Sequence, residues 1–111
     1  ILIEVPHARD FLIEHLSLQS FIEFTLWSQH LILHTRESLA SMLAAAGFKN
    51  ILIESVQRYG LANHFHWMRN QKPGGHKSNL SIIETTELSS AYALALAKID
   101  ATDTLVAIAN T

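Results

Sequence analysis

Three short aliphatic runs, separated by segments with helical spacing, limit this chain to a small set of folds. They cover residues 1–5, 51–56 and 105–109. Strands that helices cover on both faces carry apolar residues at nearly every position, so the runs predict strands. We expect residues 1–5 to form a central strand that ends at Pro6, because proline cannot donate to a ladder. The 111 residues are then expected to form a single α/β domain, residues 1–111, with about three strands and flanking helices.

The segments between these runs carry helix signals of different strength. Thr35 is expected to cap a helix that Gly47 ends, and Thr86 to cap a second helix before a turn at residues 102–103. Their apolar positions recur at helical spacing, at Leu39, Met42, Leu43 and Ala46 in the first helix and at Leu88, Ala91, Tyr92, Ala95 and Ile99 in the second. A right-handed strand–helix–strand unit is therefore expected between residues 1 and 56.

Weaker patterns cover the rest of the chain. Residues 7–25 predict a short helix or an ordered loop after a cap at Asp10, and residues 57–71 predict one short helix. Residues 72–77, with Pro73, Gly74 and Gly75, predict an exposed turn.

Composition narrows the classes of function. Hydrophobic residues make up 49% of the chain and charged residues 16%, so we expect extra burial and some apolar contact with a partner. The net charge is −2 and the basic residues are scattered, which argues against nucleic acid and anionic membrane surfaces as partners. No apolar run is long enough for a transmembrane helix. The absence of cysteine fits a cytoplasmic protein.

The order of several blocks resembles the C-terminal half of a class I S-adenosylmethionine-dependent methyltransferase, in a bacterial subgroup that acts on small molecules. The resemblance extends over nearly the whole chain. The blocks that carry it are residues 1–6, Gln29 and His30, residues 37–39, 45–48, 57–64, 72–76 and 102–105. It implies a partial Rossmann-like fold whose last two strands form an antiparallel pair, and a small-molecule substrate.

The departure from this family concerns the methyl donor. The family holds S-adenosylmethionine with a glycine-rich loop after its first strand, and the four glycines here, at 47, 60, 74 and 75, form no such motif. The chain also opens directly on a strand pattern, so we expect a piece of a longer enzyme. We then expect the full-length enzyme to bind S-adenosylmethionine. We expect this piece alone to bind no cofactor and to have no catalytic activity.

Histidine is the natural candidate for a general base near neutral pH, and His30 ranks first because the resemblance places it beyond the first strand, at the substrate crevice. The alternative is that His30 bonds a backbone carbonyl and fixes a loop. Glu4 either points into the crevice or marks the exposed face of its strand. Tyr59, His64 and His66 are expected to line the substrate pocket.

Two other ligands have weaker support in the sequence. His64, His66 and His76 lack the spacing of a zinc motif, and His64 and His66 share a face only on a strand, so no metal is expected. Lys72 and Lys77 beside Gly74 and Gly75 suggest an anion cradle, although most such loops are only turns.

Two rival functions remain beside the enzyme. In one, the chain is a non-catalytic association module that forms a homo-oligomer through an open sheet edge. In the other it is a small histidine-based binder of a metal or another ligand.

Overall fold

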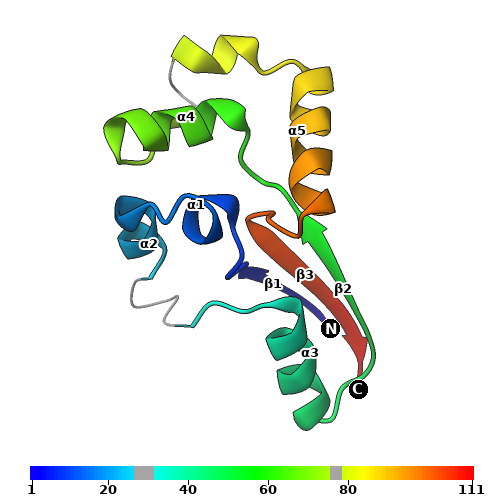
Figure 1. The fold of residues 1–111 in the computed structure, drawn as a ribbon. Coiled ribbons are helices and arrows are strands. Elements are labelled where there is room, and N and C mark those ends of the chain that lie inside the picture. The colour runs from blue at the N-terminus through cyan, green and yellow to red at the C-terminus, as the bar shows by residue number, and fades with distance from the viewer. Residues whose placement is uncertain (27–31, 76–78) are drawn as a thin grey trace.

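The computed structural model describes residues 1–26, 32–75 and 79–111. Within them the chain forms a three-stranded sheet with helices at one end and on one face (Figure 1). The strands are β1 (Leu2–Pro6), β2 (Lys49–Val56) and β3 (Thr104–Asn110). The helices are α1 (Phe11–Glu14), α2 (Gln19–Thr25), α3 (Arg36–Ala45), α4 (Leu61–Asn70), the 3₁₀ helix η2 (Asn79–Ile83) and α5 (Thr86–Lys98). The prediction of an α/β chain with about three strands is confirmed.

The strand order is β1–β3–β2, with both pairings antiparallel. The predicted antiparallel pair of the last two strands is therefore confirmed. The prediction that residues 1–5 form the central strand is wrong for the described sheet, because β3 lies in the middle and β1 at an edge. β1 and β2 run in the same direction but are not neighbours, since β3 enters between them.

Helix α3 forms because its ends are well specified. The Thr35 hydroxyl accepts the Ser38 N–H and the Ser38 hydroxyl accepts the Thr35 N–H, a reciprocal cap. Gly47 follows the helix at φ +94°, a conformation that glycine adopts without strain. The spacing predicted this helix correctly, although Met42 is 47% exposed and does not face the core as expected.

The core lies between α3 and one face of the sheet. Leu39 and Leu43 of α3 pack on Leu105 and Ala107 of β3, and partly buried residues from β1 and β2 surround them. Arg36 fixes the start of α3 to β2, since its guanidinium donates to the Ile53 carbonyl at 2.7 Å and to the Ser55 hydroxyl at 2.7 Å.

The other face of the sheet carries an exposed apolar row. Leu2, Ile108 and Leu52 are register partners across the three strands, and they are 65%, 44% and 53% exposed. The next row holds Glu4, Val106 and Glu54. Described residues therefore leave this end of the face uncovered.

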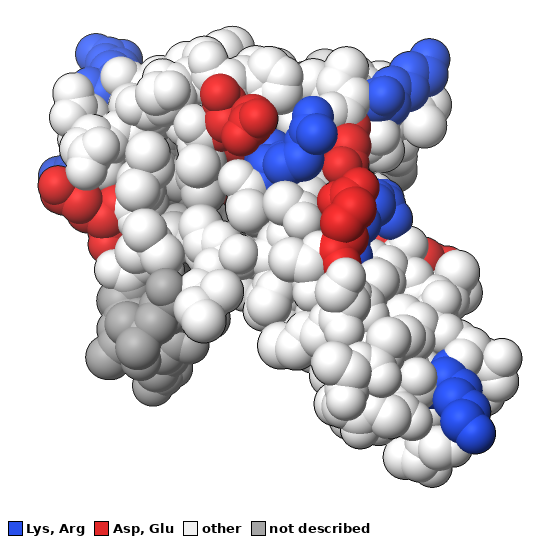
Figure 2. Space-filling view, turned by 60° about the horizontal axis from the view of Figure 1, so that its bottom comes forward, with Lys and Arg blue, Asp and Glu red and all other residues white. Residues whose placement is uncertain are grey.

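Helices α1, α2, α4 and α5 gather at the end of the sheet where β1 and β2 stop and β3 begins (Figure 1). Charged side chains are scattered over the described part of the face in Figure 2, with wide uncharged areas between them. No helix among the described residues has both the length and the apolar character needed to cross a bilayer.

Candidate functional site

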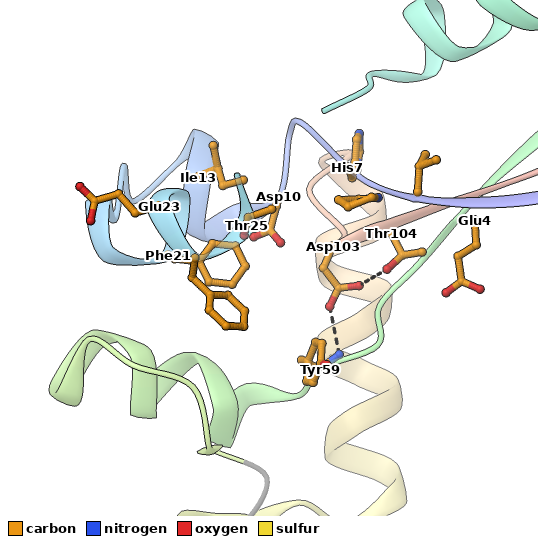
Figure 3. A pocket seen from close by; sticks show the side chains of 13 residues that line it. Glu4, His7, Asp10, Ile13, Phe21, Glu23, Thr25, Tyr59, Asp103 and Thr104 are labelled. Atoms are coloured by element: carbon orange, nitrogen blue, oxygen red, sulfur yellow. Dashed lines mark hydrogen bonds between the residues drawn. The ribbon is translucent and has the colours of Figure 1, made fainter. Parts of the chain in front are cut away.

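A cavity of about 930 Å³ lies at the end of the sheet where β1 and β2 stop (Figure 3). Because β3 runs antiparallel to both neighbours, this end combines the carboxyl ends of β1 and β2 with the start of β3. The volume of the cavity is in the range of small-molecule pockets. The wall is formed by Glu4, Val5, Pro6, His7, Asp10, Ile13, Phe21, Glu23, Phe24, Thr25, Tyr59, Asp103 and Thr104.

Asp10 enters this wall because it caps α1. Its Oδ1 accepts the Leu12 N–H at 2.8 Å, and the residue is only 4% exposed. No hydrogen bond to a described residue occupies Oδ2. Figure 3 shows the carboxyl group pointing into the space between Phe21 and Asp103. Burial raises the pKa of Asp10 to about 7, with a smaller contribution from the neighbouring charge of Asp103, so the group titrates near neutral pH.

Asp103 holds the turn that presents Tyr59. Its carboxylate accepts the backbone N–H groups of Arg58 and Tyr59 at 2.9 and 3.0 Å, and the Thr104 hydroxyl at 2.8 Å. Burial raises the pKa of Asp103, and these donors oppose that shift. Both oxygens of Asp103 thus accept hydrogen bonds, whereas in Asp10 only Oδ1 has a hydrogen bond to a described residue.

His7 closes the wall beside β1. Its Nδ1–H donates to the Thr102 carbonyl at 2.8 Å, which leaves Nε2 as the unprotonated nitrogen, 3.8 Å from Asp100. Burial lowers the pKa of His7 and outweighs the effect of the Thr102 carbonyl, which acts in the opposite direction. His7 is therefore neutral at neutral pH.

A second group of polar side chains centres on the buried His64, and its members do not line the cavity. His64 Nδ1 is hydrogen-bonded to the Tyr92 hydroxyl, and His64 Nε2 lies 3.5 Å from the Gln57 amide nitrogen. Burial lowers the pKa of His64 to about 4 and raises the pKa of Tyr92 to about 12. Both groups are neutral near pH 7 as a result, and neither is matched to proton transfer there.

The predicted pocket residues are only partly brought together. Glu4 and Tyr59 line the cavity. Glu4 is also exposed and forms an ion pair with Arg58 at 2.8 Å, so it both faces the cavity and lies on the exposed face of its strand. His64 lies behind the wall, and His66 accepts the Asn70 amide at 3.1 Å on another side of α4. His30 lies outside the described residues.

The described histidines are not arranged to bind a metal ion together. His64 and His66 are both on α4, where an offset of two residues turns their side chains about 200° apart. Among residues 1–26, 32–75 and 79–111 there is no group of three His, Cys, Asp or Glu side chains placed to hold a metal ion. His76 lies outside these ranges.

The loop with Gly74 and Gly75 is less exposed than predicted. Gly75 is buried, and a Cβ there would lie 2.3 Å from the Asn63 Cα, so the loop packs closely on α4. Close backbone approach gives Gly75 a structural role. Lys77, the second lysine of the predicted anion cradle, is not among the described residues.

Sequence analysis did not identify Asp10, Asp103 and Phe21 as site residues. Asp10 and Asp103 were recognised only as a cap and a turn, which are roles that they do have. One signal in the sequence bears on the cavity: Asp10 follows the first predicted strand and Asp103 precedes the last one. The antiparallel pairing of β1 with β3 brings these two strand ends together.

Comparison with protein-family models, with curated proteins and with solved structures gave no match to this chain.

Proposed function

We propose that this chain is the C-terminal portion of a class I S-adenosylmethionine-dependent methyltransferase that acts on a small molecule in the cytoplasm. In this proposal the cavity is the substrate-side wall of the active site. The observation that carries it is the position of the cavity at the carboxyl ends of β1 and β2, which run in the same direction. In the mostly parallel sheet that the resemblance implies for the whole enzyme, ligands bind at this edge. The antiparallel β2–β3 pair agrees with the Rossmann-like sheet that the resemblance implies.

The methyl donor would be held by a different part of the enzyme. Gly60 follows β2 and caps α4, but the Glu84 carboxylate already accepts the Ala62 N–H at the start of this helix. Gly47 ends α3, and Gly74 and Gly75 pack over α4, so none of the four glycines opens a free helix start for the donor. The described residues therefore do not fit S-adenosylmethionine. We assign to this chain only the contacts with the methyl acceptor.

Calorimetry with S-adenosylmethionine tests this division. We expect no binding heat with the 111-residue chain and saturable binding to a protein that continues upstream in the gene. Asp10→Asn in that longer protein is the matched control, because the cavity wall is not the donor site and donor affinity should be unchanged. Donor binding to the 111-residue chain alone, or no donor binding to the longer protein, would contradict the proposal.

His30 remains the proposed base of the reaction. If it takes a proton from the acceptor, His30→Ala in the longer protein lowers kcat while the affinity for the donor is retained. Unchanged turnover would return His30 to a purely structural role.

A second function, association of two copies, is favoured by the exposed sheet face. The apolar row consists of Leu2, Ile108 and Leu52. Along β2, Lys49 lies on one side of this row and Glu54 on the other. A two-fold axis along this row would place Glu54 of one copy opposite Lys49 of the other. Complementary charge flanking an apolar centre is typical of an isologous interface. The partner in this proposal is a second copy of the chain.

A further inference from the structure

The cavity has an aromatic side. Phe21 and Phe24 line it and rest on Trp67, with ring centroids 5.0 and 5.1 Å away, and Tyr59 faces them from the end of β2. Trp67 is buried and supports these rings from α4. A flat apolar group would find dispersion contacts and apolar burial here.

The charged groups on the wall are all acidic. Glu4, Asp10, Glu23 and Asp103 line the cavity, and no lysine or arginine is among the described residues that do. Arg58, which does not line the cavity, forms an ion pair with Glu4 at 2.8 Å. The Asp103 carboxylate accepts hydrogen bonds from three donors. Asp10 differs, because its Oδ2 faces the cavity without a hydrogen bond to a described residue.

We propose that the cavity binds a small ligand with an aromatic body and a protonated amine, with the body against Phe21 and Phe24 and the amine on Asp10 Oδ2. That this ligand is the methyl acceptor rests on the proposed function, but the binding itself does not. An anionic ligand would meet four carboxyl groups and no lysine or arginine among the described lining residues, and a neutral one would leave the buried Asp10 oxygen without a charged partner.

Asp10 couples binding to proton release. Burial keeps the pKa of this carboxyl near 7, and a cation at Oδ2 favours its ionised form. The titratable groups around it are Asp103 before β3, Tyr92 on α5, His64 behind Tyr92, Glu23 on α2 and His7 after β1. His7, His64 and Tyr92 stay neutral near pH 7, so the ionisation of Asp10 dominates the pH dependence.

Phenethylamine and phenethyl alcohol, which share the aromatic body and differ in charge, provide the test on the 111-residue chain. By calorimetry at about pH 8 we expect the amine to bind at least about tenfold more tightly than the alcohol. Its affinity should fall by about tenfold in all as the pH drops through the pKa of Asp10, with proton release at binding seen as a dependence of the heat on the buffer. Alcohol affinity should not change with pH.

Asp10→Asn should lower amine affinity about tenfold and leave alcohol affinity unchanged, because asparagine keeps the cap on α1 but has no charge. Glu37→Gln on α3 is the matched control, since it removes one negative charge far from the cavity and should change neither affinity. Equal binding of amine and alcohol by the unsubstituted chain, or no binding of the amine, would overturn the proposal without any variant. Neither result bears on donor binding by the longer protein.

Discussion

Asp10 is the residue at which stability and ligand binding oppose each other. The carboxyl group is buried, and its folded-state pKa of about 7 lies above its ordinary value of 3.8. Between these two values the folded chain holds a proton that the unfolded chain has lost. The free energy of unfolding therefore decreases as pH rises from about 4 to about 7, because burial of the ionised group has to be overcome.

Asp10→Asn should remove this loss. At about pH 8 we expect the variant to be more stable than the unsubstituted chain by about 4 kcal/mol, because asparagine caps α1 without a charge to bury. At about pH 4 the two chains should be nearly equally stable, since Asp10 is then protonated when folded. Urea unfolding at both pH values measures the difference. A variant less stable at about pH 8 would show that the Asp10 charge stabilises the fold.

At the scale of secondary-structure elements, α4 depends on a residue from the short link between η2 and α5. Gly60 provides no side-chain cap, and the Glu84 carboxylate accepts the Ala62 N–H at 2.8 Å instead. A Cβ at Gly60 would lie 2.0 Å from Glu84 Oε1. Glycine is thus required so that Glu84 can reach the helix start, where negative charge is also favourable.

Gly60→Ala and Glu84→Gln should separate these two effects. Gly60→Ala should displace the Glu84 carboxylate and lower the free energy of unfolding by about 1–2 kcal/mol. Glu84→Gln keeps an acceptor but loses the charge, and should cost less, about 0.5 kcal/mol. Gly47→Ala does not suit as a control, because the φ of Gly47 is positive. Glu87→Gln in the first turn of α5 is the matched control for loss of a charge at a helix start, and it should cost about as much as Glu84→Gln. Chemical denaturation of the unsubstituted chain and the three variants measures these differences. An unchanged free energy of unfolding in Gly60→Ala would contradict the role of Gly60 at the start of α4.

Elements were predictable where the signal was local. Aliphatic runs gave β2 and β3 to within about two residues, and the spacing between Thr35 and Gly47 gave α3. The strand order was not predictable, because insertion of β3 between β1 and β2 depends on pairing across nearly the whole chain. For the same reason Glu4 and Tyr59 could be named as site residues, while the meeting of Asp10 with Asp103 could not.

At the scale of the whole molecule, the sheet is covered unevenly. Helix α3 buries one face, whereas Leu2, Ile108 and Leu52 stay exposed on the other. Such a patch on a small chain favours association, and burial of each of these side chains contributes about 1.5–3 kcal/mol when complete. We expect the 12.4 kDa chain to dimerise with rising concentration, which light scattering measures directly.

Ile108→Lys in the central strand should shift this equilibrium to monomer, because two copies would then bring a pair of charges into the apolar centre of the interface. Ile82→Lys is the matched control, since Ile82 is 85% exposed on η2 and lies off the sheet face. Exchange of the flanking charges tests the geometry. Lys49→Glu should weaken the dimer, because the new glutamate of one copy would lie opposite Glu54 of the other. Adding Glu54→Lys to the same chain should restore the dimer. An unsubstituted chain that stays monomeric at every concentration, or an Ile82→Lys chain as impaired as Ile108→Lys, would show that this face does not bind a second copy.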